Sequence, residues 1–294
     1  MSLLRAQPLD FDTTWAVLAK QVVRLVTEVT EGISNQEFVR LHTYTYKLAT
    51  IPQGPHKRPL ADRLYFRLKG LLEELCEGMS RDMLKLENIL SIYIERWKNF
   101  SAGMRCIDAL FDYLNRYWIK EHCDEGPSPL EGVYDSIWEL GVASWRDRMQ
   151  SRGLAQNMFC SLSLLTHSVR AGGVMDFALA RDVLDIYLDL GERPGIGRVY
   201  DTDFAQPFLE QSFHYYSQES AELMEAQSCG AFVVRAHNRI SNEIATAARY
   251  TLGETLPALC DVCERAFILQ HRETLKQFFY SLLVQDHRRD ELMR

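Results

Sequence analysis

Apolar residues recur along the chain at the three- and four-residue spacing of amphipathic helices. The first such stripe predicts a helix with one face on a core, and it contains Phe11, Trp15, Leu18, Val22, Leu25 and Val26. Ser34 and Glu37 match a capping box and predict a second helix that continues to Thr50. Residues 51–59 contain three prolines and a glycine and therefore predict a loop.

Three more helices are predicted before residue 123. The third begins near Pro59, the fourth follows a break at Ser80, and the fifth begins at Ser101. The next stretch, CDEGPSP at 123–129, contains two prolines and a glycine, and it predicts the strongest break in the chain.

The second half of the chain repeats this organisation. Helices are predicted near 131–149, 154–171, 174–190, 202–227 and 230–252, with a final helix at about 256–284, and no strand is predicted. Two successive five-helix groups indicate an all-α fold, an elongated helical repeat rod of about eleven helices in which each unit buries its apolar face on the next. We expect an N-terminal tail at 1–10, repeats at 11–126 and 127–253, and the start of a third repeat at 254–294.

Composition narrows the partners that this fold could have. The chain of 294 residues has 33 Lys and Arg against 40 Asp and Glu, a net charge of −7, which argues against nucleic acid as a partner. The sequence shows neither a signal peptide nor an uncharged stretch of about 18 residues, so no membrane partner is expected. Seven cysteines, an odd number, fit reduced thiols and predict a cytoplasmic or nuclear protein.

Motifs that carry catalysis or bind cofactors are absent from the sequence. Cys260 and Cys263 form a CxxC pair, but they lie within an apolar helical pattern and no further ligand pair completes a metal site. His122 and Cys123 are neighbours, and adjacent side chains on a helix point in different directions. The RPGIGR stretch at 193–198 is too short to cradle a phosphate and predicts a linker. We expect a protein without catalytic activity, metal or cofactor.

Two predicted helices carry a second face that contains aromatic residues. In the second helix, Leu41, Tyr44 and Leu48 form one face, and another face holds Phe38, His42, Thr45, Tyr46 and Ala49. In the fifth helix, Tyr113, Arg116 and Lys120 lie away from the core stripe. Aromatic and cationic residues together are typical of protein-binding hot spots. The alternative is that both faces are buried within a crowded five-helix bundle.

Several stretches carry a resemblance to a known family. YLNRYWIKEHCDEG at 113–126, followed by VYDSIWELGVASWRDRM at 133–149, resembles the junction of the first two repeats of the cullins, the scaffold subunits of multisubunit RING ubiquitin ligases. RLHTYTYKLAT at 40–50 is similar to the cullin second helix, and PFLEQSFHYYSQESAEL at 207–223 is similar to a stretch of the second repeat. The resemblance extends from residue 11 to about 285.

The resemblance implies a function that the residues alone do not. In cullins the second and fifth helices of the first repeat bind an adaptor, here implied to be a BTB-fold adaptor that carries F-box-type receptors. The implied adaptor-binding residues are Phe38, Leu41, His42, Thr45, Tyr46, Ala49, Tyr113, Arg116 and Lys120. A cullin recruits its RING subunit through a C-terminal domain, and no part of this sequence is similar to that domain.

The sequence departs from cullins at the implied site. His42 stands where cullins commonly have Tyr, and Lys47, Leu48 and Ala49 replace a usual Asn-x-Cys, which leaves the preferred adaptor open. Two alternatives also stay open: an α-solenoid tethering or trafficking protein, and a naturally short cullin-like antagonist that sequesters adaptors.

Overall fold

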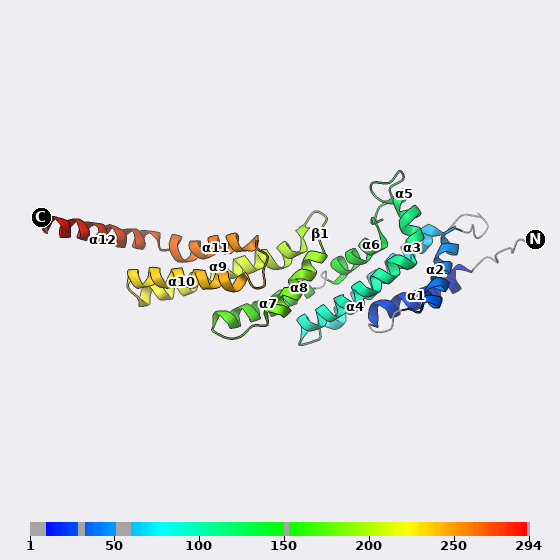
Figure 1. The fold of residues 1–294 in the computed structure, drawn as a ribbon, viewed down its shortest axis with the longest axis horizontal. Coiled ribbons are helices and arrows are strands. Elements are labelled where there is room, and N and C mark those ends of the chain that lie inside the picture. The colour runs from blue at the N-terminus through cyan, green and yellow to red at the C-terminus, as the bar shows by residue number, and fades with distance from the viewer. Residues whose placement is uncertain (1–9, 29–32, 51–59, 150–152, 293–294) are drawn as a thin grey trace, which may run out of the picture. The chain divides into compact units, whose positions relative to one another are not determined.

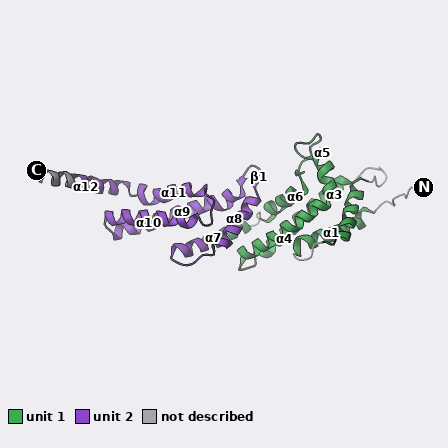
Figure 2. Ribbon diagram, in the orientation of Figure 1, with its two compact units in different colours: residues 1–158 green, residues 159–294 purple. Residues whose placement is uncertain are grey.

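The computed structural model describes residues 10–28, 33–50, 60–149 and 153–292, with side chains to residue 284. The predicted tail and the predicted loop at 51–59 lie almost entirely outside these ranges. The chain forms two compact units, Met1–Met158 and Phe159–Arg294, which Figure 2 colours separately. The predicted repeat boundaries at 126 and 253 do not coincide with this division and stay predictions.

Both units are built from helices (Figure 1). In unit 1 these are α1 (Phe11–Thr27), α2 (Asn35–Thr50), α3 (Ala61–Met83), α4 (Ile89–Leu110), the π turn η1 (Leu114–Ile119), α5 (Lys120–His122), α6 (Ile137–Ser144) and the π turn η2 (Trp145–Met149). The unit boundary falls within α7 (Leu154–Arg170). Unit 2 continues with α8 (Phe177–Asp189), β1 (Glu192–Arg193), β2 (Gly197–Arg198), η4 (Asp201–Ala205), α9 (Gln206–Ala226), α10 (Cys229–Ala247), α11 (Thr255–Glu264), η5 (Arg265–Leu269) and α12 (Arg272–Leu292).

The central contact of unit 1 is the packing of α1 on α4. A Cβ atom at Gly103 would lie 2.2 Å from the Leu25 carbonyl oxygen, so the two backbones meet closely at this glycine. The predicted start of a fifth helix at Ser101 is therefore wrong, because the small residues here serve a close helix crossing and α4 continues to Leu110. The fifth helical segment begins only after a turn at Phe111.

We predict that Gly103→Ala destabilises the protein by about 2–3 kcal/mol, because the added methyl group must push α1 away from α4. Gly70→Ala is the matched control, since Gly70 lies in α3 with open space around it, and we expect it to stabilise by about 0.5–1 kcal/mol. Urea denaturation followed by circular dichroism measures both changes. Equal free energies of unfolding for the two variants would contradict the close crossing.

Two more predicted boundaries in unit 1 are wrong. Ser80 does not break the chain, because it lies inside α3 and its buried hydroxyl donates to the Met149 carbonyl at 2.9 Å. The helix predicted from residue 131 begins at Ile137, where the Ser136 hydroxyl accepts the Glu139 amide and caps the helix. The predicted capping residue of the second helix is confirmed, since the Ser34 hydroxyl accepts the Glu37 amide.

Unit 2 contains a feature that the helical pattern did not predict. The predicted linker at 193–198 is a two-stranded antiparallel hairpin, in which Glu192 pairs with Arg198 and Arg193 with Gly197. The backbone φ angles of Gly195 and Gly197 are +73° and +120°, a region that glycine adopts readily. A tight reversal can therefore form within the seven residues 192–198.

The final predicted helix is divided into two. The chain leaves η5 at Gln270 and His271, and α12 begins at Arg272. His271 lies 3.2 Å from the Ser220 hydroxyl of α9 through its Nε2 atom. No glycine or proline marks this break, which explains why apolar spacing alone predicted one helix.

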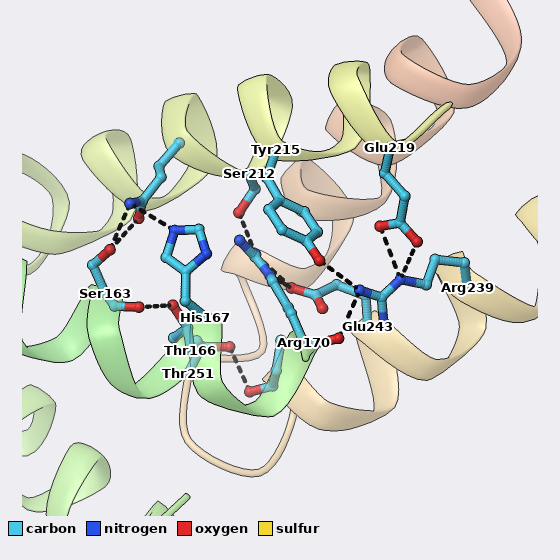
Figure 3. Close-up of polar contacts among 12 residues, drawn as sticks. Ser163, Thr166, His167, Arg170, Ser212, Tyr215, Glu219, Arg239, Glu243 and Thr251 are labelled. Carbon is cyan, nitrogen blue, oxygen red and sulfur yellow. Dashed lines mark hydrogen bonds and ion pairs between the residues drawn. The ribbon is translucent and has the colours of Figure 1, made fainter. Parts of the chain in front are cut away.

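A buried ion pair lies at the centre of unit 2 (Figure 3). Arg170 of α7 pairs with Glu243 of α10 at 2.6 Å and also donates to the Ser212 hydroxyl of α9, so one guanidinium joins three helices. Burial alone would lower the pKa of Arg170, but the charge and hydrogen bond of Glu243 outweigh it and raise that pKa. Arg239 donates to Glu219 and to the Arg170 carbonyl. The buried Arg170–Glu243 pair is thereby connected to the more exposed Arg239–Glu219 pair.

We predict that Glu243→Ala destabilises the protein by about 3–5 kcal/mol, because it leaves the Arg170 charge buried without its counterion. Glu219→Ala breaks a partly exposed pair, and we expect it to cost about 1 kcal/mol or less. The double variant Arg170→Met/Glu243→Leu should be more stable than Glu243→Ala, since it removes both charges. Denaturation midpoints test this order, and a double variant less stable than Glu243→Ala would contradict it.

Candidate functional site

Both predicted faces of helix α2 contact other helices of unit 1. Leu41 and Leu48 are buried, as predicted for the core face. Thr45, on the other face, donates its hydroxyl to the carbonyl of Leu110 at 2.7 Å. Because the last carbonyls of a helix lack intrahelical donors, this contact satisfies the end of α4. Gln21 of α1 also donates to the Glu37 carboxylate at 3.0 Å.

The segment 112–122, which contains η1 and α5, follows the turn at Phe111. Its Trp118 indole donates to the Asp62 carboxylate of α3 at 2.6 Å and stacks on His122 at 4.6 Å. Trp118 also lies 4.8 Å from the ring of Tyr65. These contacts hold the inner face of the segment on α3.

Tyr65 positions the chain that follows this segment. Its hydroxyl accepts the backbone amide of Tyr134 at 3.0 Å. Burial raises the pKa of Tyr65 to about 12, so the hydroxyl stays protonated at neutral pH. The chain after residue 122 is therefore held on α3 by a hydrogen bond from the Tyr134 amide to an uncharged hydroxyl.

Aromatic side chains from the two elements meet on the outside of unit 1. Tyr46 of α2 packs edge-on against Tyr113 with ring centroids 5.3 Å apart, and Tyr113 lies 4.7 Å from Tyr117. Nearer the start of α2, the rings of Phe38 and His42 stack with their centroids 6.1 Å apart. We call these five residues the aromatic ledge. Tyr46 is 47% exposed and Tyr117 is 60% exposed, so partner rings could reach the ledge.

Two cationic side chains accompany the aromatic ledge. Arg116 is exposed and its guanidinium pairs with Asp112, one turn earlier, at 2.7 Å. Lys120 is exposed one turn after Arg116. The ion pair with Asp112 orients the Arg116 side chain. Because the pair is exposed, it contributes little to the stability of the fold.

Three of the nine residues assigned to the adaptor surface are buried in unit 1. These are Leu41, Thr45 and Ala49, which are at most 4% exposed. Their side chains are not available at the surface of this chain, because Leu41 lies on the core face and Thr45 donates its hydroxyl to the end of α4. Phe38, His42, Tyr46, Tyr113, Arg116 and Lys120 are partly or fully exposed, and for them the assignment stays a prediction.

Sequence reasoning missed Tyr117 as a member of the ledge. Tyr117 follows Tyr113 by four residues, the spacing at which helical side chains are neighbours. That spacing could have identified it.

The two residues of the cysteine motif differ in burial, since Cys260 is only half-buried. Cys263 is buried and burial raises the pKa of its thiol to about 12, which keeps it protonated at neutral pH. Among the described residues, no group of three or more His, Cys, Asp or Glu side chains could hold a metal ion. Within the same ranges, no helix combines the length and apolar character that a membrane crossing requires.

These features are those of a helical repeat domain with exposed aromatic side chains on helix α2 and on the segment 112–122. The family model described as the cullin alpha solenoid domain matches residues 15–294. The chain therefore belongs to the cullin family.

Curated relatives agree with this family. Cullin-1 of Dictyostelium discoideum is 27% identical over 97% of this chain and 40% of the relative. Cullin-3B of Arabidopsis thaliana is 27% identical over 93% of this chain and 34% of the relative, and Cullin-1 of Schizosaccharomyces pombe is 25% identical over 93% and 37%. The chain thus spans well under half of the length of these relatives.

We predict that Thr45→Val destabilises the protein by about 1–2 kcal/mol, because the Leu110 carbonyl loses its buried donor. Thr43→Val is the matched control on the same helix, since its hydroxyl donates only to the Val39 carbonyl of its own helix in an exposed position. We expect the control to change stability by less than about 0.5 kcal/mol. Thermal unfolding of both variants makes the comparison, and a neutral Thr45→Val would contradict the anchoring role.

Proposed function

We propose that the chain is part of a non-catalytic scaffold subunit of a cullin-RING ubiquitin ligase. In this proposal the aromatic ledge, with Arg116 and Lys120, binds a BTB-fold adaptor that carries F-box-type substrate receptors. The observation that carries the proposal is the ledge itself: exposed aromatic rings from two adjoining elements, in a chain of the cullin family.

The ledge has the physical properties of a binding hot spot. Tyr side chains offer large contact areas at low conformational cost, and Arg offers directed hydrogen bonds. The Tyr46–Tyr113 contact holds both rings before a partner arrives, which reduces the ordering cost of association. The two cations favour a partner with acidic groups at the edge of the contact.

The proposed scaffold acts by proximity. A subunit that holds a receptor with its substrate near a charged E2 enzyme raises the effective concentration of the acceptor lysine without chemical groups of its own. The RING subunit would bind a C-terminal domain of the longer protein, outside this chain. We place the assembly in the cytoplasm or nucleus, with neither nucleic acid nor membrane as a partner.

We predict that Tyr46→Ala combined with Arg116→Ala weakens adaptor binding by at least about 2 kcal/mol, roughly thirtyfold. The control is Leu164→Ala with Arg181→Ala, an exposed apolar residue and an exposed Arg of unit 2, which should leave the affinity unchanged. Calorimetric titration with a purified BTB-fold adaptor bound to an F-box protein measures both affinities.

Circular dichroism of each variant shows whether the fold is intact. A folded Tyr46→Ala/Arg116→Ala variant that binds as tightly as the parent protein would exclude this surface. If the parent protein binds no BTB-fold adaptor at all, the tethering alternative gains support.

A further inference from the structure

The start of helix α6 is capped by side chains from distant positions in the chain. The first backbone amides of a helix have no acceptor within the helix itself. In α6 the amide of Ile137 donates to the side-chain oxygen of Asn115 at 2.9 Å, and the amide of Trp138 donates to the carboxylate of Asp108 at 3.0 Å. The third amide, that of Glu139, is capped locally. Two of the first three amides therefore have acceptors that lie 22 and 30 residues earlier.

The two distant caps also bond to each other. The side-chain nitrogen of Asn115 donates at 2.8 Å to the same carboxylate oxygen of Asp108 that accepts the Trp138 amide. Asp108 also carries its negative charge at the N-terminal end of α6, where the helix dipole is positive. One connected set of hydrogen bonds therefore joins the last turn of α4, the segment 112–122 and the first turn of α6.

Asn115 lies in the middle of the segment that contributes to the aromatic ledge. It follows Tyr113 by two residues and precedes Tyr117 by two. Trp118 holds the later part of the segment on α3 through its bond to Asp62, and Asn115 holds the middle on α6. In a helical segment the direction of one side chain determines the directions of its neighbours. The bonds of Asn115 therefore fix the rotation of the segment about its own axis, and with it the directions of both tyrosine rings.

We propose that Asn115 positions the aromatic ledge and couples it to the start of α6. Both ends of its side-chain amide are used within the chain, so it acts through Tyr113 and Tyr117 and not by contact with a partner. Its effect on an adaptor rests on the function proposed above. An adaptor that binds the ledge in this arrangement must stabilise the two caps, and loss of the caps must weaken the adaptor, because such coupling is reciprocal.

Binding measurements test the coupling. Asn115→Ala removes both contacts of the amide, and it should weaken binding of a purified BTB-fold adaptor with its F-box protein at least about fivefold. Asp108→Ala should have a similar effect. Asp108→Asn should recover most of the lost affinity, because it keeps an acceptor oxygen for both donors.

Two controls separate positioning from general destabilisation. Asn88→Ala is the matched control, because Asn88 precedes α4 without capping it through its side chain. Ser80→Ala removes a buried hydrogen bond elsewhere in unit 1. Both variants should bind the adaptor as the parent protein does, even though Ser80→Ala lowers the free energy of unfolding.

Hydrogen exchange followed by NMR reads the caps directly and needs no adaptor. In Asn115→Ala the amides of Ile137, Trp138 and the segment 112–122 should exchange faster than in the parent protein, while those of α1 keep their parent rates. In the parent protein, a saturating adaptor should slow the exchange of the Ile137 and Trp138 amides, since it favours the capped arrangement.

The possible outcomes distinguish this proposal from the proposed function. Parent-like exchange across 112–122 in Asn115→Ala would overturn the positioning role whether or not an adaptor binds. If the parent protein binds an adaptor and Asn115→Ala binds it equally well, the coupling is wrong and the proposed function stands. If the parent protein binds no BTB-fold adaptor, the proposed function fails, and the exchange rates alone decide the role of Asn115.

Discussion

The aromatic ledge depends on the hydrogen bond from Thr45 to the carbonyl of Leu110. This contact joins α2 to the end of α4, at the place where the chain turns into the segment 112–122. Because the bond satisfies a carbonyl that α4 itself cannot satisfy, it links α2 directly to the point where this segment begins. Tyr46 follows Thr45 directly, and Tyr113 follows the turn by two residues. The position of both rings is therefore set by the burial of their neighbours.

Helix spacing in the sequence predicted the existence and order of the helices more reliably than their ends. Amphipathic stripes identify a buried face whatever the partner helix is. The errors at Ser80 and Ser101 have a common cause: small or polar residues typical of helix ends also occur where a helix approaches another backbone. The sequence alone gives no distance between Gly103 and Leu25. The break at Gln270 and His271 lies where His271 contacts α9, and no glycine or proline marks it in the sequence.

The candidate site was predictable in outline. The second apolar face on α2 predicted a surface for another protein, which stays a prediction, and within the chain Thr45 of that face bonds to the end of α4. How the second face divides between the core and solvent could not be read from spacing, because it depends on where α4 ends. Thr45 and Ala49 are covered there, whereas Tyr46, on the same face, is not. The adaptor assignment came from resemblance to cullins, since the residues by themselves indicate only a protein-binding surface.

The π turn η1 makes the phase of the later side chains depend on the type of helix as well as on residue identity. A π turn accommodates one residue more between hydrogen-bonded groups than an α-helical turn does. If the same residues Leu114–Ile119 adopted α-helical bonding throughout, the extra residue would rotate every later side chain by about 100°. Lys120 and the stretch tied to Tyr65 would then change phase relative to Tyr113, even though every side chain is kept.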